Sequence, residues 1–282
     1  MLFELILNGL VVGSKLGLAS LGFAVIYYTS REFHVAYGVL LALAGYIALV
    51  MIDGYSVPAV VAVAAVVAIG ALLGMGVERW IYRPLGDHFS VMMMALGISI
   101  VIENALQIGF GADDKLLSSA LMSKQLIWGE LRLRYLELAI AGAFALVWLL
   151  LYYVLERHRI GLALRAVMRD AGMAELVGIK TRNIRLFAYG LGSAIGAISG
   201  LVMLFDSGLR PTAGFEVLLF AFIATVLGMG NLHRVAVWSV LIGVILNVFS
   251  WKLPTQFGTL FIFTLMFAYL LWASRSGAMA RH

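Results

Sequence analysis

The sequence predicts an all-α, polytopic integral membrane protein with about eight or nine transmembrane helices. Hydrophobic residues make up 63% of the 282 residues and charged residues only 12%, and the mean hydropathy is +1.01. A soluble globular domain is only about half apolar, so the composition excludes that class. Apolar segments of membrane-spanning length recur along the whole chain, which indicates a single transmembrane domain over residues 1–282.

The first five predicted spans are long enough to cross a bilayer. The apolar run that follows Leu5 has no basic leading segment and exceeds the roughly 7 to 15 apolar residues of a secretion signal, so we expect a retained first helix. The five spans are residues 5–28, 35–52, 57–77, 89–110 and 136–155.

Four further spans are predicted in the second half, and several of them are short. About 20 predominantly apolar residues are needed to cross roughly 30 Å of hydrocarbon. One short segment is therefore a candidate for a re-entrant helix, which is why the expected count is eight or nine. The four segments are residues 186–205, 214–230, 235–249 and 258–272.

Residues 156–185 form a cationic loop between the fifth and sixth spans, with seven Lys or Arg against three acids. Apolar residues at three- and four-residue spacings predict a first short helix in it. Asp170 then has the side chain of an N-cap, and a second helix over residues 171–177 would end at Gly178 in the left-handed conformation. Two functions are open for this loop. It is either a solvated anchor that fixes topology, or a short helix whose exposed Met173, Leu176, Val177 and Ile179 dock in a groove of a soluble partner.

Charge bias predicts which side of the membrane each end occupies. With the cationic loop in the cytoplasm, the N-terminus lies outside and the C-terminus inside, and thirteen Lys or Arg fall on the cytoplasmic side against six outside. This bias follows the positive-inside rule. Because these cations lie in loops beside apolar spans, nucleic-acid binding is not expected.

Four stretches of the sequence resemble the permease subunits of branched-chain amino acid ABC importers. One is Phe-His-Val-Ala-Tyr-Gly at residues 33–38, the second is Ile-Glu-Asn-Ala-Leu at 102–106 followed by Gly-Phe-Gly, and the third is 224–232. The fourth is the cationic loop, with Gly161, Arg165, Ala166, Ala174, Leu176, Gly178, Ile179 and Lys180. Glu103, where the family more often has an amide, and His233-Arg234, where it has small residues, depart from the pattern.

The resemblance implies a complex of several subunits in the bacterial cytoplasmic (inner) membrane. The partners would be a second permease, homologous or identical, two cytoplasmic ATPase subunits and an extracytoplasmic solute-binding protein. Residues 170–179 would be the coupling helix that docks on an ATPase. The residues expected to serve that coupling are Arg165, Ala166, Asp170, Met173, Ala174, Glu175, Leu176, Gly178 and Ile179.

The long outer loop, residues 111–135, also has two interpretations. It is either a solvated connection with an aromatic anchor in its segment 125–128, or a contact surface for the binding protein. In the second case Asp113, Asp114, Glu130 and Arg132 are the candidate docking charges, with residues 206–211 as a second patch.

Glycines at four-residue spacing indicate close packing of helices. Gly192, Gly196 and Gly200 share one face of the sixth span, and Gly70 and Gly74 repeat the spacing in the third. Small residues at this spacing let membrane helices approach closely. The sequence does not say whether the partner helix belongs to this chain or to a second permease.

Five polar residues fall at membrane depth, where they are costly unless they find partners. Lys15 and Glu103 are hypothesised to form a buried pair between the first and fourth spans. The group as a whole either holds helices together or lines a solute pathway. The five are Asn8, Lys15, Glu103, Asn104 and Gln107.

Motifs for catalysis are missing from the sequence, so no enzyme activity is expected. It has no cysteine, no His-Glu-x-x-His metal motif, no Gly-x-Ser-x-Gly elbow and no phosphate-binding Gly-x-x-x-x-Gly-Lys-[Ser/Thr] loop. No cofactor is expected on this chain, and ATP and Mg²⁺ would bind to the partner ATPase subunits. The expected function is the translocation pathway of an ATP-driven importer of branched-chain amino acids or related small polar solutes. The alternative is an ion-coupled secondary transporter, for which only Glu103 and Glu216 are available.

Overall fold

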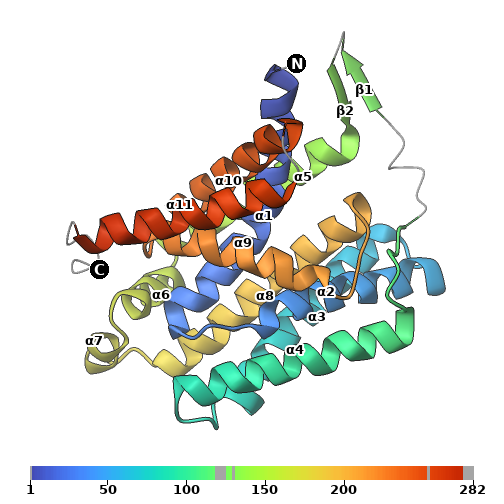
Figure 1. Ribbon diagram of the computed structural model, residues 1–282. Coiled ribbons are helices and arrows are strands. Elements are labelled where there is room, and N and C mark those ends of the chain that lie inside the picture. The colour runs from blue at the N-terminus through green and yellow to red at the C-terminus, as the bar shows by residue number, and fades with distance from the viewer. Residues whose placement is uncertain (1, 118–124, 129–130, 253–254, 276–282) are drawn as a thin grey trace.

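The protein is a bundle of long helices, described in a computed structural model that covers residues 2–117, 125–128, 131–252 and 255–275 (Figure 1). The first half contains α1 (Leu2–Ser30), α2 (Ala36–Leu49), α3 (Ala59–Gly76), α4 (His88–Phe110) and α5 (Tyr135–Arg157). Short π-helical segments, η1 (Val50–Gly54) and η2 (Val77–Tyr82), extend α2 and α3. The second half contains α6 (Arg159–Arg169), α7 (Ala171–Leu176), α8 (Thr181–Asp206), α9 (Ala213–Gly228), α10 (Leu232–Lys252) and α11 (Thr255–Arg275).

Seven helices in the described part of the chain are long and apolar enough to cross a membrane. Each of the nine predicted spans corresponds to a helix, but α9 and the stretch Phe257–Leu271 of α11 are shorter than the other seven. The predicted count of eight to nine spans is therefore not confirmed. Helix α10 runs from Leu232 to Lys252 and is therefore longer than the span predicted at residues 235–249.

One short hairpin departs from the predicted all-α fold. Strands β1 (Gln125–Trp128) and β2 (Leu131–Arg134) pair antiparallel, with Gln125 opposite Arg134. The predicted outer loop thus contains regular structure. The alternation of leucine and arginine in β2 is the period-two pattern of a strand, although four residues are too few to separate it from a loop by pattern alone.

Helix α1 lies at the centre of the bundle. It packs against α5, α8, α9 and α10, and its segment from Leu18 to Ile26 is almost completely buried. By contrast, α4 lies at the periphery, where it packs on α2 and η2 and leaves Ile100, Val101 and Ile108 exposed (Figure 1). The core is therefore built around α1 and α8, and α4 presents most of its surface outward.

The helices begin and end where polar side chains or glycine satisfy their terminal backbone groups. Asp87 caps α4 by accepting a hydrogen bond from the Ser90 amide at 2.8 Å, and α4 ends at Gly111 with φ +82°. Helix α9 ends at Gly228, and the next residue, Met229, has the left-handed conformation. Asn231 then caps α10 through the His233 amide at 2.9 Å.

The small-residue face of α8 packs against helices of the same chain. A Cβ atom on Gly192 would lie 2.5 Å from the carbonyl oxygen of Gly22 in α1, and one on Gly200 would overlap the carbonyl oxygen of Leu41 in α2. Gly196 lies against the ring of Tyr37. On another side of α8, Gly70 and Gly74 of α3 approach Ala197 and Ser193. These close approaches let α1, α2 and α3 surround α8.

The bundle has two distinct ends. Because α5 runs from β2 to α6, the β1–β2 hairpin lies at one end and the pair α6–α7 at the other. Helix α8 follows α7 and ends at Asp206, which binds Arg134 at the start of α5. We name these the hairpin end and the α7 end.

Candidate functional site at the two polar ends of the bundle

The short helix α7 has the capping geometry that the sequence predicts. The Asp170 carboxylate accepts a hydrogen bond from the Met173 amide at 3.0 Å. Gly178 follows with φ +86°, and the Ile179 amide donates to the Ala174 carbonyl at 3.0 Å. The predicted helix over residues 171–177 is confirmed to within one residue.

Helix α7 presents apolar side chains outward. Met173 is 63% exposed, Leu176 82% and Val177 75%, whereas Ala174 is buried against the rest of the loop. Glu175 and Gly178 are exposed, and Ile179 and Ala166 are half-buried. Three large apolar side chains on a surface turn form a patch that a protein partner can cover. We call Met173, Leu176 and Val177 the α7 patch.

Polar contacts fix the loop in place. Arg165 of α6 forms a 2.7 Å ion pair with Glu156 at the end of α5. The Thr181 hydroxyl, at the start of α8, donates to the Glu175 carboxylate of α7. Gly161 allows α6 to cross close to α5, because a Cβ atom there would overlap the Val154 carbonyl oxygen. The α7 patch is therefore held on a folded support rather than on a free loop.

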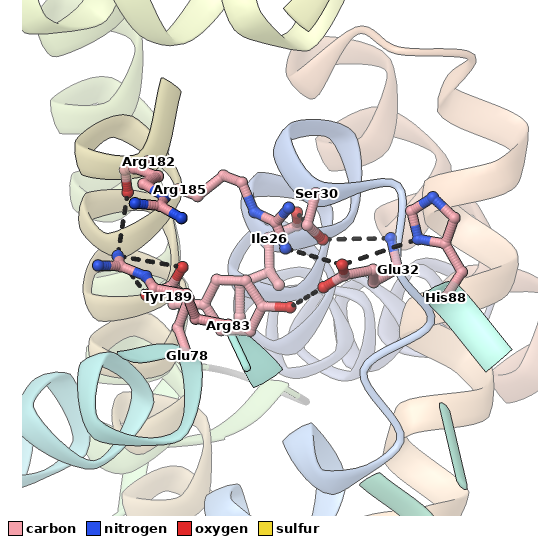
Figure 2. A network of polar contacts seen from close by, with 9 residues as sticks. All are labelled: Ile26, Ser30, Glu32, Glu78, Arg83, His88, Arg182, Arg185 and Tyr189. Atoms are coloured by element: carbon pink, nitrogen blue, oxygen red, sulfur yellow. Dashed lines mark hydrogen bonds and ion pairs between the residues drawn. The ribbon is translucent and has the colours of Figure 1, made fainter. Parts of the chain in front are cut away.

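A buried ion pair joins α8 to the linker between α1 and α2 (Figure 2). Arg185 donates to the Glu32 carboxylate at 2.7 Å, and the Tyr189 hydroxyl donates to the same group at 3.0 Å. Glu32 is only 5% exposed, and the His88 ring lies 3.7 Å from it. A buried carboxylate needs such partners, so these contacts fix the start of α8 against α1.

A second acid at the same end holds η2. Arg83 donates to Glu78 at 2.9 Å, and it also reaches the Arg182 carbonyl on α8 at 3.5 Å (Figure 2). Glu78 is 2% exposed. Together the contacts of the two acids join the α1–α2 linker, η2 and the first turns of α8, the helix that follows α7 in the chain.

His34 completes the buried polar layer at this end. Its Nδ1 lies 2.7 Å from the Tyr82 hydroxyl of η2, and its Nε2 has no partner among the described residues. Burial lowers the pKa of His34 to about 3. The ring is therefore neutral at physiological pH.

At the hairpin end, the predicted partner of Lys15 is wrong. Lys15 binds Asp206 at the end of α8, and Asp206 also accepts from Arg134 at 2.7 Å. Arg134 in turn pairs with Glu137 at 2.9 Å. Because α8 packs directly on α1 whereas α4 lies at the periphery, Asp206 reaches Lys15 where Glu103 does not.

The other polar residues predicted at membrane depth do not gather into one site. Gln107 donates to Glu103 at 3.4 Å, and Asn104 donates to the Ile100 carbonyl within its own helix. Glu103 and Gln107 are half-buried, while Asn104 and Asn8 are exposed. The three residues of α4 thus form a polar strip on a helix that is mostly outward-facing.

Each end of the bundle contains a cavity, and α9 connects the two. The hairpin-end cavity, of about 400 Å³, is lined by Lys15, Asp206, Arg210 and Glu216, among others. Asp114 also lines it, and its pairing with Arg210 lowers the pKa of the Asp114 carboxyl group. The α7-end cavity, of about 610 Å³, is lined by the last turn of α9 and by four arginines. The hairpin-end cavity is thus lined by charges of both signs, among which Lys15 pairs with Asp206 and Arg210 with Asp114.

The candidate docking charges of the outer loop lie partly outside the described structure. Asp113 and Asp114 are exposed, and Asp114 pairs with Arg210 of the second predicted patch, so these two patches adjoin. Glu130 lies outside the described residues, and Arg132 belongs to β2. Among the described residues, no group of three His, Asp or Glu side chains could hold a metal ion.

The sequence does not predict that several residues of these networks are buried and paired. Glu32, Glu78 and His34 lie in short connections between apolar spans, where an ionisable residue is normally solvated. Arg134 and Asp206 end apolar segments at positions where charges are usual. The sequence offers only a weak indication of the two buried acids, because Glu32 and Glu78 each lie directly beside an arginine between two predicted spans. Burial of these side chains depends on tertiary packing.

The family comparison covers most of the chain. Residues 5–270 match the family model described as the permease component of the branched-chain amino acid transport system. BraD, a permease protein of the high-affinity branched-chain amino acid transport system of Pseudomonas aeruginosa, is 28% identical over 256 residues, which cover 85% of this chain and 83% of BraD.

Similar relatives occur in other organisms. LivH, the corresponding permease protein of Escherichia coli K12, is 26% identical over 94% of this chain and 91% of its own length. The probable LivH of Methanocaldococcus jannaschii is 24% identical over 92% of this chain and 85% of its own. A solved structure, PsaBC from Streptococcus pneumoniae in complex with Fab, superposes with a TM-score of 0.50 over 93% of this chain and 89% of that one at 10% identity. That superposition supports the fold alone.

Proposed function

The chain belongs to the family of permease components of branched-chain amino acid transport systems, and from this membership we propose that it forms the translocation pathway of an ATP-driven importer. The solute is a branched-chain amino acid or a related small polar molecule, as the names of the relatives suggest. ATP and Mg²⁺ bind to separate ATPase subunits. Family membership favours this function over ion-coupled secondary transport.

The observation that carries the proposal is the α7 patch on its rigid support. In the proposed topology the α7 end is cytoplasmic, the N-terminus lies outside and the protein resides in the inner membrane of a bacterium. Met173, Leu176 and Val177 then face the cytoplasm, where exposed apolar side chains call for a partner. The partner is an ATPase subunit whose groove receives residues 170–179 as the coupling helix.

Movement of the docked helix has a direct structural route into the bundle. Glu175 is bonded to Thr181 at the start of α8, and Arg185 one turn later is bonded to Glu32 between α1 and α2. A closure of the ATPase subunits that shifts α7 would thus move α8 relative to α1. These two helices also meet at the hairpin-end cavity through Lys15 and Asp206.

Charged and polar side chains suggest where the binding protein and the second permease subunit contact the chain. The binding protein delivers the solute to the hairpin end, where the cavity is lined by bases and acids that pair with each other, Lys15 with Asp206 and Arg210 with Asp114. The carboxylate and the ammonium group of an amino acid would exchange with the partners in these pairs. The strip of Glu103, Asn104 and Gln107 on α4 is covered by a second permease subunit, because polar side chains at membrane depth are costly against lipid.

Co-purification tests the docking helix. We expect the double variant Leu176→Ser/Val177→Ser to insert normally and to lose most of the ATPase subunit that co-purifies with the wild-type chain. The matched control is Ile160→Ser/Leu162→Ser, which removes two exposed apolar side chains from neighbouring α6 and should retain the ATPase. Equal retention by both variants would mean that α7 is only a topological anchor.

A further inference from the structure

The cavity at the α7 end has a charge distribution that the transport function does not use. Four arginines line it: Arg31 directly after α1, Arg165 and Arg169 on α6, and Arg234 in the first turn of α10. Glu156, also in the lining, neutralises Arg165 through a 2.7 Å ion pair. Arg31 donates to the neutral carbonyl of Met168, at 2.9 Å. Its charge is therefore not compensated there.

The other two arginines are available to a ligand. The guanidinium groups of Arg169 and Arg234 have no ion-pair or hydrogen-bond partner among the described residues, since Arg234 donates only its backbone amide, to Asn231, and both residues are exposed. His233 adds a donor: Trp148 Nε1, which can only donate, lies 2.9 Å from His233 Nδ1, so the ring proton is on Nε2. Three uncompensated guanidinium groups around one cavity favour an anion with several oxygens.

The wall beneath the arginines is apolar and aromatic. Tyr27, Trp148, Leu151, Tyr152 and Leu270 line it. Tyr152 is 49% exposed, and its neighbours Leu149 and Tyr153 on α5 are 61% and 62% exposed, so the wall continues into an apolar outer surface. A site that combines an arginine rim with a wall of this kind suits an amphiphile rather than a small soluble anion.

Backbone strain is concentrated at the same cavity. Three non-glycine residues in the described chain have positive φ, and two of them, Arg31 at +58° and Met229 at +45°, line the cavity. Such conformations cost free energy and gather at binding sites. Arg31 is the first residue after α1, and its left-handed backbone conformation turns the chain there.

From this combination we propose that the α7-end cavity binds the phosphate headgroup of an anionic phospholipid, with an acyl chain on the aromatic wall. Arg169 and Arg234 contact the phosphate oxygens, and Arg31 contributes charge from the opposite wall. In the proposed topology the cavity lies at the level of the cytoplasmic leaflet, where anionic headgroups are available. The lipid lies beside α6 and stabilises the support of α7.

Lipid-dependent thermal stability of the purified chain tests the site. Phosphatidylglycerol added to the detergent-solubilised protein should raise its Tm, whereas phosphatidylcholine should not. The variant Arg169→Gln/Arg234→Gln should weaken phosphatidylglycerol binding about five-fold for each arginine removed, which corresponds to about 1 kcal/mol each. The matched control is Arg157→Gln/Arg159→Gln, because these two exposed arginines flank the same loop without lining the cavity. It should keep the full shift.

Each other outcome overturns the proposal. Equal stabilisation by phosphatidylcholine would mean that only the apolar wall matters. Equal loss in both variants would indicate diffuse surface charge. Protection by millimolar inorganic phosphate, as strong as by phosphatidylglycerol, would make the site one for a free anion. If lipid has no effect and the cavity variant instead loses the co-purifying ATPase, the arginines belong to the subunit interface. The Tm measurement needs no partner, so its failure is separate from a failure of the proposed function.

Discussion

At the scale of single residues, the contact between Arg185 and Glu32 is expected to dominate the stability of the α7 end. Arg185→Met would leave Glu32, which is 5% exposed, without its cation. Breaking a fully buried pair costs about 3 to 5 kcal/mol, and the Arg185 side chain is 30% exposed. We therefore expect a loss of about 2 to 3 kcal/mol, measured by unfolding in detergent.

Two further variants check this assignment. Arg185→Met/Glu32→Gln should be more stable than Arg185→Met alone, because it removes the unpaired charge together with its former partner. Arg182→Met, which removes an exposed cation one turn earlier, should change stability by less than about 0.5 kcal/mol. If Arg182→Met cost as much as Arg185→Met, the effect would be one of general loop charge.

His34 gives the protein a pH dependence of known sign. Burial lowers its pKa from 6.5 to about 3, so below about pH 6.5 the unfolded chain gains a proton that the folded chain does not. The free energy of unfolding that neutral His34 contributes is fully present above pH 6.5. It decreases as the pH falls toward 3, by at most about 1.4 kcal/mol per pH unit. His34→Phe should flatten the dependence of Tm on pH between 6.5 and 4.5, while the exposed control His158→Phe should leave the slope unchanged. If Tm depended on pH as steeply in His34→Phe as in the wild-type chain, this role of His34 would be contradicted.

At the scale of elements, the close approach of α8 to α2 predicts a strong glycine requirement. A Cβ atom on Gly200 would overlap a backbone carbonyl of α2, which cannot move without shifting the helix. Gly200→Ala should therefore destabilise the protein by about 1 to 3 kcal/mol. Gly142→Ala on α5, where no atom lies within 4 Å, should be neutral or stabilising by up to about 1 kcal/mol. The measurement is the free energy of unfolding of both variants in the same detergent, and equal values would contradict the glycine requirement at position 200.

Elements whose signals are local could be predicted from the sequence, and contacts between distant elements could not. Asp170, Gly178 and the spacing between them predict α7 because capping depends on a few consecutive residues. Lys15 was paired with the wrong acid because its partner depends on which helix packs on α1. The depth of an acid in the membrane does not by itself show whether Glu103 or Asp206 is the partner of Lys15. The burial of Glu32 and His34 has the same origin, since it results from the packing of α8 and η2 over a short linker.

At the scale of the whole molecule, the absence of cysteine makes the topology directly measurable. In the proposed orientation, Leu176→Cys should react with a membrane-impermeant maleimide only in inside-out vesicles, and Asp113→Cys only in intact cells. The chain is expressed without its partner subunits, so both side chains are exposed, and a missing reaction means that the membrane blocks the reagent. Ala62→Cys, at a fully buried position, should react in neither preparation. Labelling of the first two from the same side would overturn the topology.

The five-residue linker between α1 and α2 has a consequence for protein engineering. Arg31 faces the α7-end cavity, Glu32 binds α8 and His34 contacts Tyr82 of η2. Three of the five linker residues thus depend on one register of the backbone. Connections between membrane helices normally tolerate added residues and are common places for epitope tags. Here the insertion of even one residue would misplace all three contacts, so this linker should be as intolerant of length changes as the interior of a helix.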